Sequence, residues 1–414
     1  MTETINTFDI KGSKTTATVY ANTIDEVTIG QIQQMTNEDA MDGATIAIMP
    51  DSHYGKGSTV GTTIQLPTDG TLRIVPDVVG VDIGCSISAT KLNKAHLTQT
   101  ELERLDDVIN RYVPAGFNVN SRETNRIDMR HVNHLLRELT IPISDKDETH
   151  LRKSVGTLGG GNHFISLEQH GEDIWLLIHT GSRKLGVLTE TYHQNIADNQ
   201  FGFSSQQMTR IIERLKAEGR QKDIERELQL AKNEHITPHL KYLEGQLAQN
   251  YLNDMDKAQQ YAVLNHEAIR NEIFMRMGWD MVDHIHSMHN YVDIDSKIIR
   301  KGATDASEGK RLVIPLNMRD GSLIAVGKGN PDWNFSAPHG AGRVMSRRQA
   351  KDKLNAHAYI KEMSESGIYT TSAVTSTLDE APQVYKPKED IIYGTVDTME
   401  IIAEIKPIYN FKAH

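Results

Sequence analysis

The amino-acid sequence predicts a mixed α+β protein in which helices surround short-stranded sheets. Three blocks of sequence support this class. Residues 1–93 are short β-branched runs separated by glycines, residues 203–278 are rich in Glu, Lys, Gln, Leu and Ala, and residues 279–414 return to short strands and glycine turns. Because strands and helices occur in blocks without a regular βαβ alternation, an α+β arrangement is favoured over a doubly wound sheet.

The amino-terminal block predicts two strands followed by a helix. Residues Thr45–Met49 and Arg73–Val75 are dense in β-branched side chains, and each run ends at a proline, which is typical of short strands. Residues Thr98–Val113 predict a helix, because acidic residues lie near its start and complement the helix dipole.

The block at residues 203–278 predicts a helical insertion. No Pro-, Gly- or Ser-rich linker divides the chain, so we expect one catalytic domain over residues 1–414 that contains this insertion. One further helix is expected near Arg347–Ser364. The positions suited to the helix ends of the insertion are an amino-terminal cap at Ser204 or Ser205, a second cap at Asp254 or Asp256, and a stop at Gly278.

Composition excludes several classes of protein. The 414 residues carry 45 Lys and Arg against 55 Asp and Glu, a net charge of −10, which excludes a globally basic nucleic-acid coat but not a local basic groove. No apolar run is long enough to cross a membrane, and the first ten residues are polar, so neither a membrane span nor a secretory signal is expected. The single cysteine excludes an intrachain disulfide, so we expect a cytoplasmic protein.

Candidate metal ligands lie in glycine-bounded segments. Thiolate, carboxylate and imidazole together suit Zn, Mn, Fe or Co. Taken singly, the cysteine can be a small buried hydrophobe and each histidine a structural residue. Histidines on loops at strand ends can converge on one site, so the combination favours a metal centre. The candidates are Asp82, Cys85, His163, His179 and His289.

Phosphate chemistry is indicated more weakly. The loop Gly159–Asn162 can bring backbone N–H groups to a phosphate, but it is neither a Walker A loop nor a dinucleotide fingerprint, and a tight turn explains it better. Basic side chains near the glycine loops can bind phosphate or form a solvated face. They are Lys56, Arg183, Lys184, Arg300, Lys301, Arg343, Arg347 and Arg348.

His339 lies between small residues, so both ring nitrogens can be reached. A neutral imidazole in such a position can be a covalent nucleophile, a general base or a metal ligand. The residue pattern by itself leaves these three roles open.

Together the motifs resemble one family, the RtcB RNA ligases. They follow the order of that family over most of the chain, and Tyr385 and Lys412 occupy familiar positions near its end. The matching strings are MPDSHYGKGSTVG (49–61), VGVDIGC (79–85), GTLGGGNHF (156–164), IHTGSRKLG (178–186), HNYV (289–292), RKGA (300–303) and HGAGRVMSR (339–347).

The resemblance implies an RtcB-like fold and a ligase that joins RNA ends bearing a 3′-phosphate or 2′,3′-cyclic phosphate to 5′-hydroxyl ends, in RNA splicing or repair. Such enzymes use GTP and manganese. A histidine becomes covalently guanylylated, GMP passes to the RNA 3′-phosphate, and the 5′-hydroxyl displaces it. An activating protein partner resembling archease is a further possibility in this family.

Carried over by motif, His339 is the expected nucleophile. The five candidate ligands above are expected to hold two Mn ions, with the thiolate of Cys85 bridging. The residues expected at the nucleotide are Asn162, Asn317, Met318, His339, Gly340, Gly342, Tyr385 and Lys412. The residues expected near phosphates or RNA are Asp51, His53, Arg183, Lys301 and Arg343.

The sequence departs from the family pattern in two places, which suggests a divergent branch. Ser166 stands where the family has an acidic residue that recognises guanine, with Glu168 two positions further on. Leu316 and Asn317 replace a Gly-Ser pair, so a side chain stands where backbone would approach the nucleotide. Loss of the carboxylate predicts weaker discrimination between GTP and ATP.

Two other readings compete with ligation. A manganese-dependent phosphohydrolase or phosphodiesterase would act on RNA terminal phosphates with a metal-activated water and no covalent nucleotide. A non-catalytic RNA-binding module would hold a structural metal. A closed structural site needs fewer polar loop residues than this chain carries, and a hydrolase has less need of His339.

Overall fold

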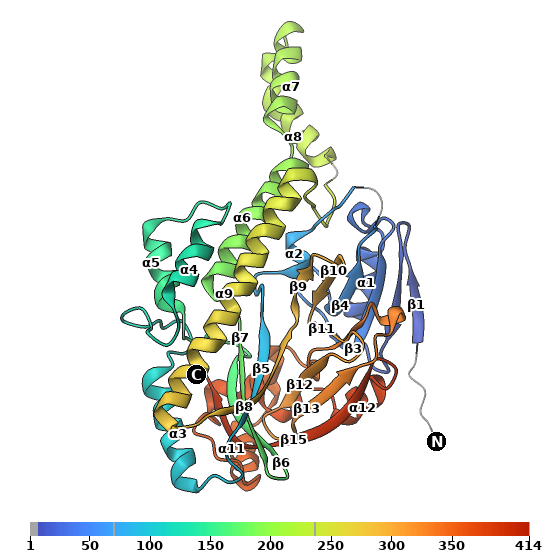
Figure 1. Cartoon of the computed structure of the whole chain (residues 1–414). Coiled ribbons are helices and arrows are strands. Elements are labelled where there is room, and N and C mark those ends of the chain that lie inside the picture. The colour runs from blue at the N-terminus through green and yellow to red at the C-terminus, as the bar shows by residue number, and fades with distance from the viewer. Residues whose placement is uncertain (1–6, 69–70, 236, 414) are drawn as a thin grey trace.

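The computed structural model describes residues 7–68, 71–235 and 237–413 (Figure 1). Its strands form two larger sheets and one short strand pair, and helices pack around them, which confirms the predicted α+β class. Of the ten polar amino-terminal residues considered above, residues 1–6 lie outside the described part of the chain. Within the described ranges, no helix combines the length and apolar character needed to cross a membrane.

The first sheet is antiparallel except for the parallel pair β2 and β3. In spatial order it contains β1 (Thr7–Lys11), β2 (Thr16–Tyr20), β3 (Thr45–His53), β4 (Val60–Gln65), β10 (Ile298–Lys301) and β9 (Asn290–Asp293).

The strand expected at Thr45–Met49 is confirmed as part of β3. The strand expected at Arg73–Val75 is wrong, since only Ile74 forms an isolated bridge, to Leu243. The physical reason is Pro76, which has no N–H to donate to a sheet and instead begins helix α2 (Pro76–Val79).

The second sheet is antiparallel throughout and carries most of the site described below. In spatial order it contains β12 (Arg311–Asn317), β13 (Gly321–Gly327), β15 (Met399–Lys412), β6 (Phe164–His170), β7 (Asp173–Thr180), β5 (Ser86–Leu92) and β8 (Met281–Met288). The short pair is β11 (Ala303–Asp305) with β14 (Ser336–Pro338).

The helices lie around these sheets (Figure 1). The remaining α-helices are α1 (Glu26–Met35), α3 (Gln99–Tyr112), α4 (Met129–Arg137), α5 (Asp145–Ser154), α6 (Lys184–Phe201), α7 (Ser205–Ala217), α8 (Ile224–Glu234), α9 (Gly245–Met277), α10 (Arg347–Lys353), α11 (Ala356–Glu365) and α12 (Lys388–Gly394). Short 3₁₀ helices occur at Asp39–Met41, Gln221–Asp223, Pro331–Trp333, Thr375–Glu380 and Pro382–Val384.

The expected helix ends are partly confirmed. Thr98 caps α3 in a reciprocal capping box with Glu101, Ser204 caps α7, and Gly278 ends α9 in the left-handed conformation. A cap at Asp254 or Asp256 is wrong, because α9 already begins at Gly245 and Asp254 is buried within it, bonded to His193 and Thr140.

The single helix expected at Arg347–Ser364 is two helices. Leu354 is extended, and the side chain of Asn355 accepts from the N–H of Ala358 to start α11. Asn competes for backbone hydrogen bonds in this way and so favours a new cap over a continued helix.

The two halves of residues 203–278 behave differently. Helices α7 and α8 project away from the sheets, whereas α9 runs along the body of the molecule (Figure 1). One end of α9 packs Tyr251, Met255 and Ala258 into the larger apolar core, and the other packs Ile269 and Ile273 into a second core beside β6 and β7. The division into one domain over residues 1–414 with an insertion at 203–278 stays a prediction.

Candidate active site

Strand register brings the expected metal ligands to one end of the second sheet. Cys85 directly precedes β5, and its neighbour Ser86 pairs with Thr180 on one side and Met288 on the other. His179 and His289 therefore stand beside Cys85, and the N–H of His289 donates to the carbonyl of Cys85 at 3.0 Å. His163 directly precedes Phe164, which pairs with His179.

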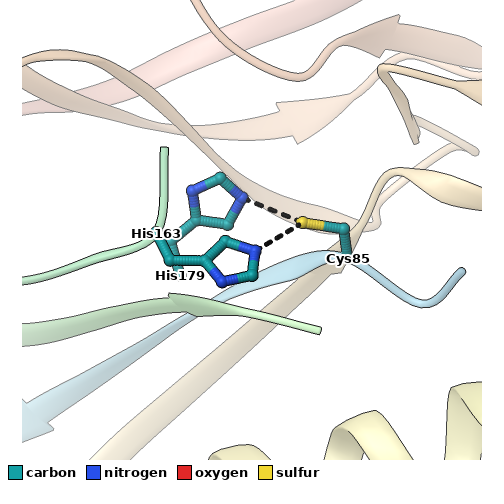
Figure 2. A group of neighbouring side chains, drawn as sticks. All are labelled: Cys85, His163 and His179. Carbon is teal, nitrogen blue, oxygen red and sulfur yellow. Dashed lines mark hydrogen bonds between the residues drawn. The ribbon is translucent and has the colours of Figure 1, made fainter. Parts of the chain in front are cut away.

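The ligand atoms of these residues face one another. The Sγ atom of Cys85 lies 3.2 Å from Nε2 of His179 and 3.6 Å from Nε2 of His163 (Figure 2). Nε2 of His289 lies 3.4 Å from Nε2 of His179, and Oδ2 of Asp82 lies 3.5 Å from Nε2 of His163. The fold thus gathers all five residues expected at a metal.

The donor set fits a transition metal. His163 donates from Nδ1 to the carbonyl of Leu158 at 2.9 Å, which leaves the Nε2 lone pair directed at the cluster. Burial lowers the pKa of His179 and of His289, and neighbouring imidazoles lower both further, so these rings are neutral donors. Burial, with the charge of Asp82, raises the pKa of the Cys85 thiol, an effect that a bound cation would reverse.

His339 stands next to this cluster, just after β14. Its ring centroid lies 4.9 Å from that of His289. Oδ2 of the buried Asp51 lies 2.7 Å from Nδ1 of His339 and accepts the backbone N–H of His339 at 3.2 Å. A carboxylate at Nδ1 favours the tautomer that carries its proton there, so the Nε2 lone pair is left to react.

A cavity of about 400 Å³ is lined both by candidate metal ligands, among them Cys85, His179 and His289, and by the expected nucleotide residues. Its size suits a nucleotide-like ligand. Every residue expected at the nucleotide contributes to its lining: Asn162, Asn317, Met318, His339, Gly340, Gly342, Tyr385 and Lys412.

The residues expected near phosphates or RNA divide into two groups. His53, Lys301 and Arg343 line the cavity. The carboxylate of Asp51 contacts Nδ1 of His339. The guanidinium of Arg183 instead donates to the carbonyl of Gly116 at 3.0 Å and to the hydroxyl of Thr157 at 3.2 Å.

Glu380 is a cavity residue that the sequence motifs did not indicate. It is buried, accepts from Lys412 at 2.5 Å and from the hydroxyl of Tyr385 at 2.6 Å, and so holds both expected nucleotide contacts in place. Burial raises the pKa of Glu380, but the charges of Lys412 and Arg347 outweigh it and lower the pKa below its usual value. Glu380 belongs to no recognisable motif, so only the fold could reveal it.

Glu168 is a second buried carboxyl on the cavity wall. Ser166 and Glu168 share one face of β6, and the hydroxyl of Ser166 donates to Oε1 of Glu168 at 2.8 Å. Oε2 of Glu168 and the hydroxyl of Ser322 have no hydrogen-bond partner among the described residues. Burial raises the pKa of Glu168 to about 7. The carboxyl two positions after Ser166 therefore remains available to a ligand in the cavity.

Fold and site together define an α+β enzyme with a Cys/His/Asp metal-type centre and an oriented histidine in one polar cavity. Residues 31–141 and 137–413 match the family described as tRNA-splicing ligase RtcB. Because the match covers most of the chain, the chain belongs to the RtcB family, a family of RNA ligases.

Individual relatives agree with this assignment. RNA-splicing ligase RtcB1 of Escherichia coli is 29% identical over 401 residues that cover 88% of each protein. A second Escherichia coli protein, RNA-splicing ligase RtcB, is 28% identical over 401 residues with the same coverage. The tRNA-splicing ligase RtcB of Aeropyrum pernix is 25% identical over 445 residues, covering 87% of this chain and 86% of the relative.

Proposed function

We propose that this chain joins RNA 3′-phosphate or 2′,3′-cyclic phosphate ends to 5′-hydroxyl ends through a covalent His339–GMP intermediate, with manganese as cofactor, in cytoplasmic RNA splicing or repair. The observation that carries the proposal is His339 itself. Asp51 lies at its Nδ1 atom, and its ring lies beside His289 inside the cavity. A general base or structural histidine needs no such cavity lined for a nucleotide.

His339 acts as the nucleophile in the first step. The lone pair of Nε2 attacks the α-phosphorus of GTP, a P–N bond forms, and the bond to pyrophosphate breaks. Asp51 holds the proton on Nδ1 and stabilises the positive charge that develops on the ring. GMP then passes to the RNA 3′-phosphate, which makes GMP the leaving group for the 5′-hydroxyl.

The metal would be held by the five residues gathered at the end of the second sheet. Divalent manganese bound there supplies positive charge that neutralises the phosphates during attack. A soft thiolate with imidazole and carboxylate favours manganese over magnesium. The ligands are Asp82, Cys85, His163, His179 and His289.

Nucleotide choice depends on the cavity wall near Glu168. An ionised Glu168 can accept two N–H groups of the guanine base through its two carboxyl oxygens, the unpartnered Oε2 and the neighbouring Oε1. The corresponding edge of adenine presents one N–H group and one acceptor, so it matches the carboxylate less well. Ser166 lacks the charge expected at its own position, so Glu168 is the carboxyl that can restore preference for GTP. ATP remains the competing nucleotide because Leu316 and Asn317, which replace the Gly-Ser pair of the family pattern, also line this cavity.

The test is intact-protein mass spectrometry after incubation with manganese and either GTP or ATP. Wild type should gain the mass of GMP, and His339→Ala should gain none. His357→Ala, which removes an exposed histidine on α11, is the matched control and should behave as wild type. A manganese-binding protein that forms no adduct with either nucleotide would contradict ligation by this route and favour the phosphohydrolase.

RNA and any activating protein are the proposed partners. Because the net charge is −10, RNA binding is proposed to be local to the cavity and its basic side chains, such as Lys301 and Arg343. Such binding should weaken steeply as salt increases.

A further inference from the structure

The cavity lining includes four charged side chains contributed by four separate elements. Helix α2 supplies Asp77, α6 supplies Glu190, the end of β10 supplies Lys301, and the loop after β3 supplies Lys56. We call these four residues the charged lobe. They line the same cavity as His339, but they lie outside the nucleotide and metal residues assigned above.

Asp77 and Glu190 form a carboxyl pair. Helices α2 and α6 pack together here: the side chain of Gln194, one turn after Glu190, accepts the backbone N–H of Asp77 at 3.0 Å, and both carboxyl groups line the cavity. Glu190 is only 3% exposed, and its Oε2 atom accepts from the hydroxyl of Thr191 at 3.1 Å. Burial, followed by the neighbouring carboxyl of Asp77, raises the pKa of Glu190 to about 7. Glu190 can therefore gain or lose a proton near neutral pH.

The two lysines give the lobe positive charge close to the pair. Lys301 is 8% exposed and donates to the backbone carbonyls of Lys56 and Asp77, and the structure describes no carboxylate within ion-pair distance of it. Burial lowers the pKa of Lys301 to about 8. Lys56 is largely exposed, and its Nζ atom lies 3.7 Å from Oδ1 of Asp77. A phosphate oxygen is the natural partner for both cations.

Tyr251 supplies a second, independent observation. Its hydroxyl is fully buried and has no hydrogen-bond partner among the described residues. Burial raises the pKa of Tyr251, and the charges of Glu190 and Asp77 raise it further. A buried donor that no protein group satisfies is suited to a water or hydroxyl group bound beside the pair.

We propose that the Asp77–Glu190 pair is the general base that takes the proton from the RNA 5′-hydroxyl in the sealing step. This inference rests on the proposed ligase function. The 5′-oxygen forms a bond to the phosphorus of the activated RNA end, and the bond from that phosphorus to GMP breaks. The proton of the hydroxyl moves to Glu190, which shares it with Asp77 and releases it to solvent through the cavity. Lys301 and Lys56 hold the phosphate charge near the attacking oxygen.

Other groups of the site are less suited to this proton. Glu380 is occupied by Lys412 and Tyr385. Glu168 lies on the wall that carries Ser322, within the nucleotide part of the cavity. The charged lobe is thus the part of the cavity that combines cations for a phosphate with a carboxyl that titrates near neutral pH.

The experiment separates sealing from the earlier steps. Wild type and Glu190→Gln are incubated with manganese, GTP, and two RNA strands ending in a 3′-phosphate and a 5′-hydroxyl, and the products are resolved on a denaturing gel from pH 5.5 to 9. Glu190→Gln should form the histidine adduct and the GMP-capped RNA end at wild-type rates. Its sealing rate should fall by about 100-fold, so the capped RNA accumulates.

The pH profile distinguishes a base from a residue that only supports Lys301. Wild-type sealing should rise with pH through about 7, where Glu190 loses its proton, and Glu190→Gln should lose that rise. Asp198→Asn, which changes a carboxyl on the same helix paired with Lys241, is the matched control and should match wild type. Infrared titration of the metal-free proteins should show a carboxyl band with a midpoint near pH 7 that Glu190→Gln lacks.

The outcomes are distinguishable. If wild type forms no histidine adduct, the proposed function fails. If wild type ligates and Glu190→Gln seals at the wild-type rate with an unchanged pH profile, the general-base assignment is overturned. A slower variant that keeps the wild-type pH profile also overturns it, because a supporting residue changes the rate without changing the titrating group.

Discussion

At the scale of single residues, chemistry in this protein depends on carboxylates that stand behind the reactive groups. Asp51 orients His339, and Glu380 fixes Lys412 and Tyr385. Each is buried, so its charge acts through short contacts in a medium that screens poorly. Substitutions that keep size but remove charge should therefore impair function more than folding.

Asp51→Asn should slow formation of the His339 adduct by about 100-fold or more, because an amide does not hold the proton on Nδ1 or stabilise the charged ring as a carboxylate does. Quenched mass spectrometry over time measures the rate. Asp42→Asn, at an exposed aspartate, is the control. Adduct formation at the wild-type rate in a folded Asp51→Asn protein would refute the orienting role.

Glu168→Gln should change the pH dependence of stability. Burial raises the pKa of Glu168 from its usual 4.5 to about 7 in the folded chain. The contribution of the protonated carboxyl to the free energy of unfolding is therefore fully present below about pH 4.5 and is lost as pH rises through 7. Gln mimics the protonated acid, so the variant should gain up to about 3 kcal/mol in free energy of unfolding at pH 8 but little at pH 5. Urea unfolding at both pH values tests this. An equal change at both pH values would contradict it.

At the scale of elements, α9 is the helix that supports the site from behind. The side-chain amide of Asn265 accepts from the N–H groups of Gly156 and Thr157 and donates to the carbonyl of Thr157 and the hydroxyl of Thr180. It therefore ties the loop before His163 to the end of β7. The reading of residues 203–278 as one helical block missed this role, because nothing in a Leu- and Ala-rich pattern marks a buried Asn as a partner of distant loops.

Asn265→Ala should lower the free energy of unfolding by about 3 kcal/mol, because several buried backbone groups lose their partner. Thermal and urea unfolding measure the loss. Gln260→Ala, at an exposed position of the same helix, should change stability by less than about 0.5 kcal/mol. Comparable losses in the two variants would show that helix propensity, not the buried contacts, sets the cost.

At the scale of the whole molecule, the site forms only when distant segments meet. Its expected metal ligands come from residues 82–85, 163, 179 and 289, and its proposed nucleophile is residue 339. A cation that binds this arrangement in the folded chain alone has to stabilise the whole fold.

Manganese should raise the free energy of unfolding of wild type by about 2.7 kcal/mol at a concentration 100-fold above its Kd. Cys85→Ala and His179→Ala should lose most of this gain, since both remove atoms at the centre of the cluster. Magnesium at the same concentration is the control and should stabilise less, because it disfavours thiolate and imidazole. Equal stabilisation of wild type and both variants by manganese would place the ion elsewhere.

Sequence patterns alone predict the α+β class, the family, and the residues that meet at the candidate metal site. These features are local or are encoded in motifs: β-branched runs, a capping residue such as Ser204, and histidines in glycine-bounded segments. Local signals still failed where a neighbour competed with them, as Pro76 did for the strand at Arg73–Val75 and Asn355 for the helix at 347–364.

Packing between distant segments determines which further side chains complete the site. Glu380, the orientation of Asp51, the unpartnered oxygen of Glu168 and the pair of Asp77 with Glu190 depend on strand register and helix packing between segments far apart in the chain. The physical reason is that burial and hydrogen bonding set a carboxyl group's charge and reach, and both arise from neighbours that adjacent residues do not specify.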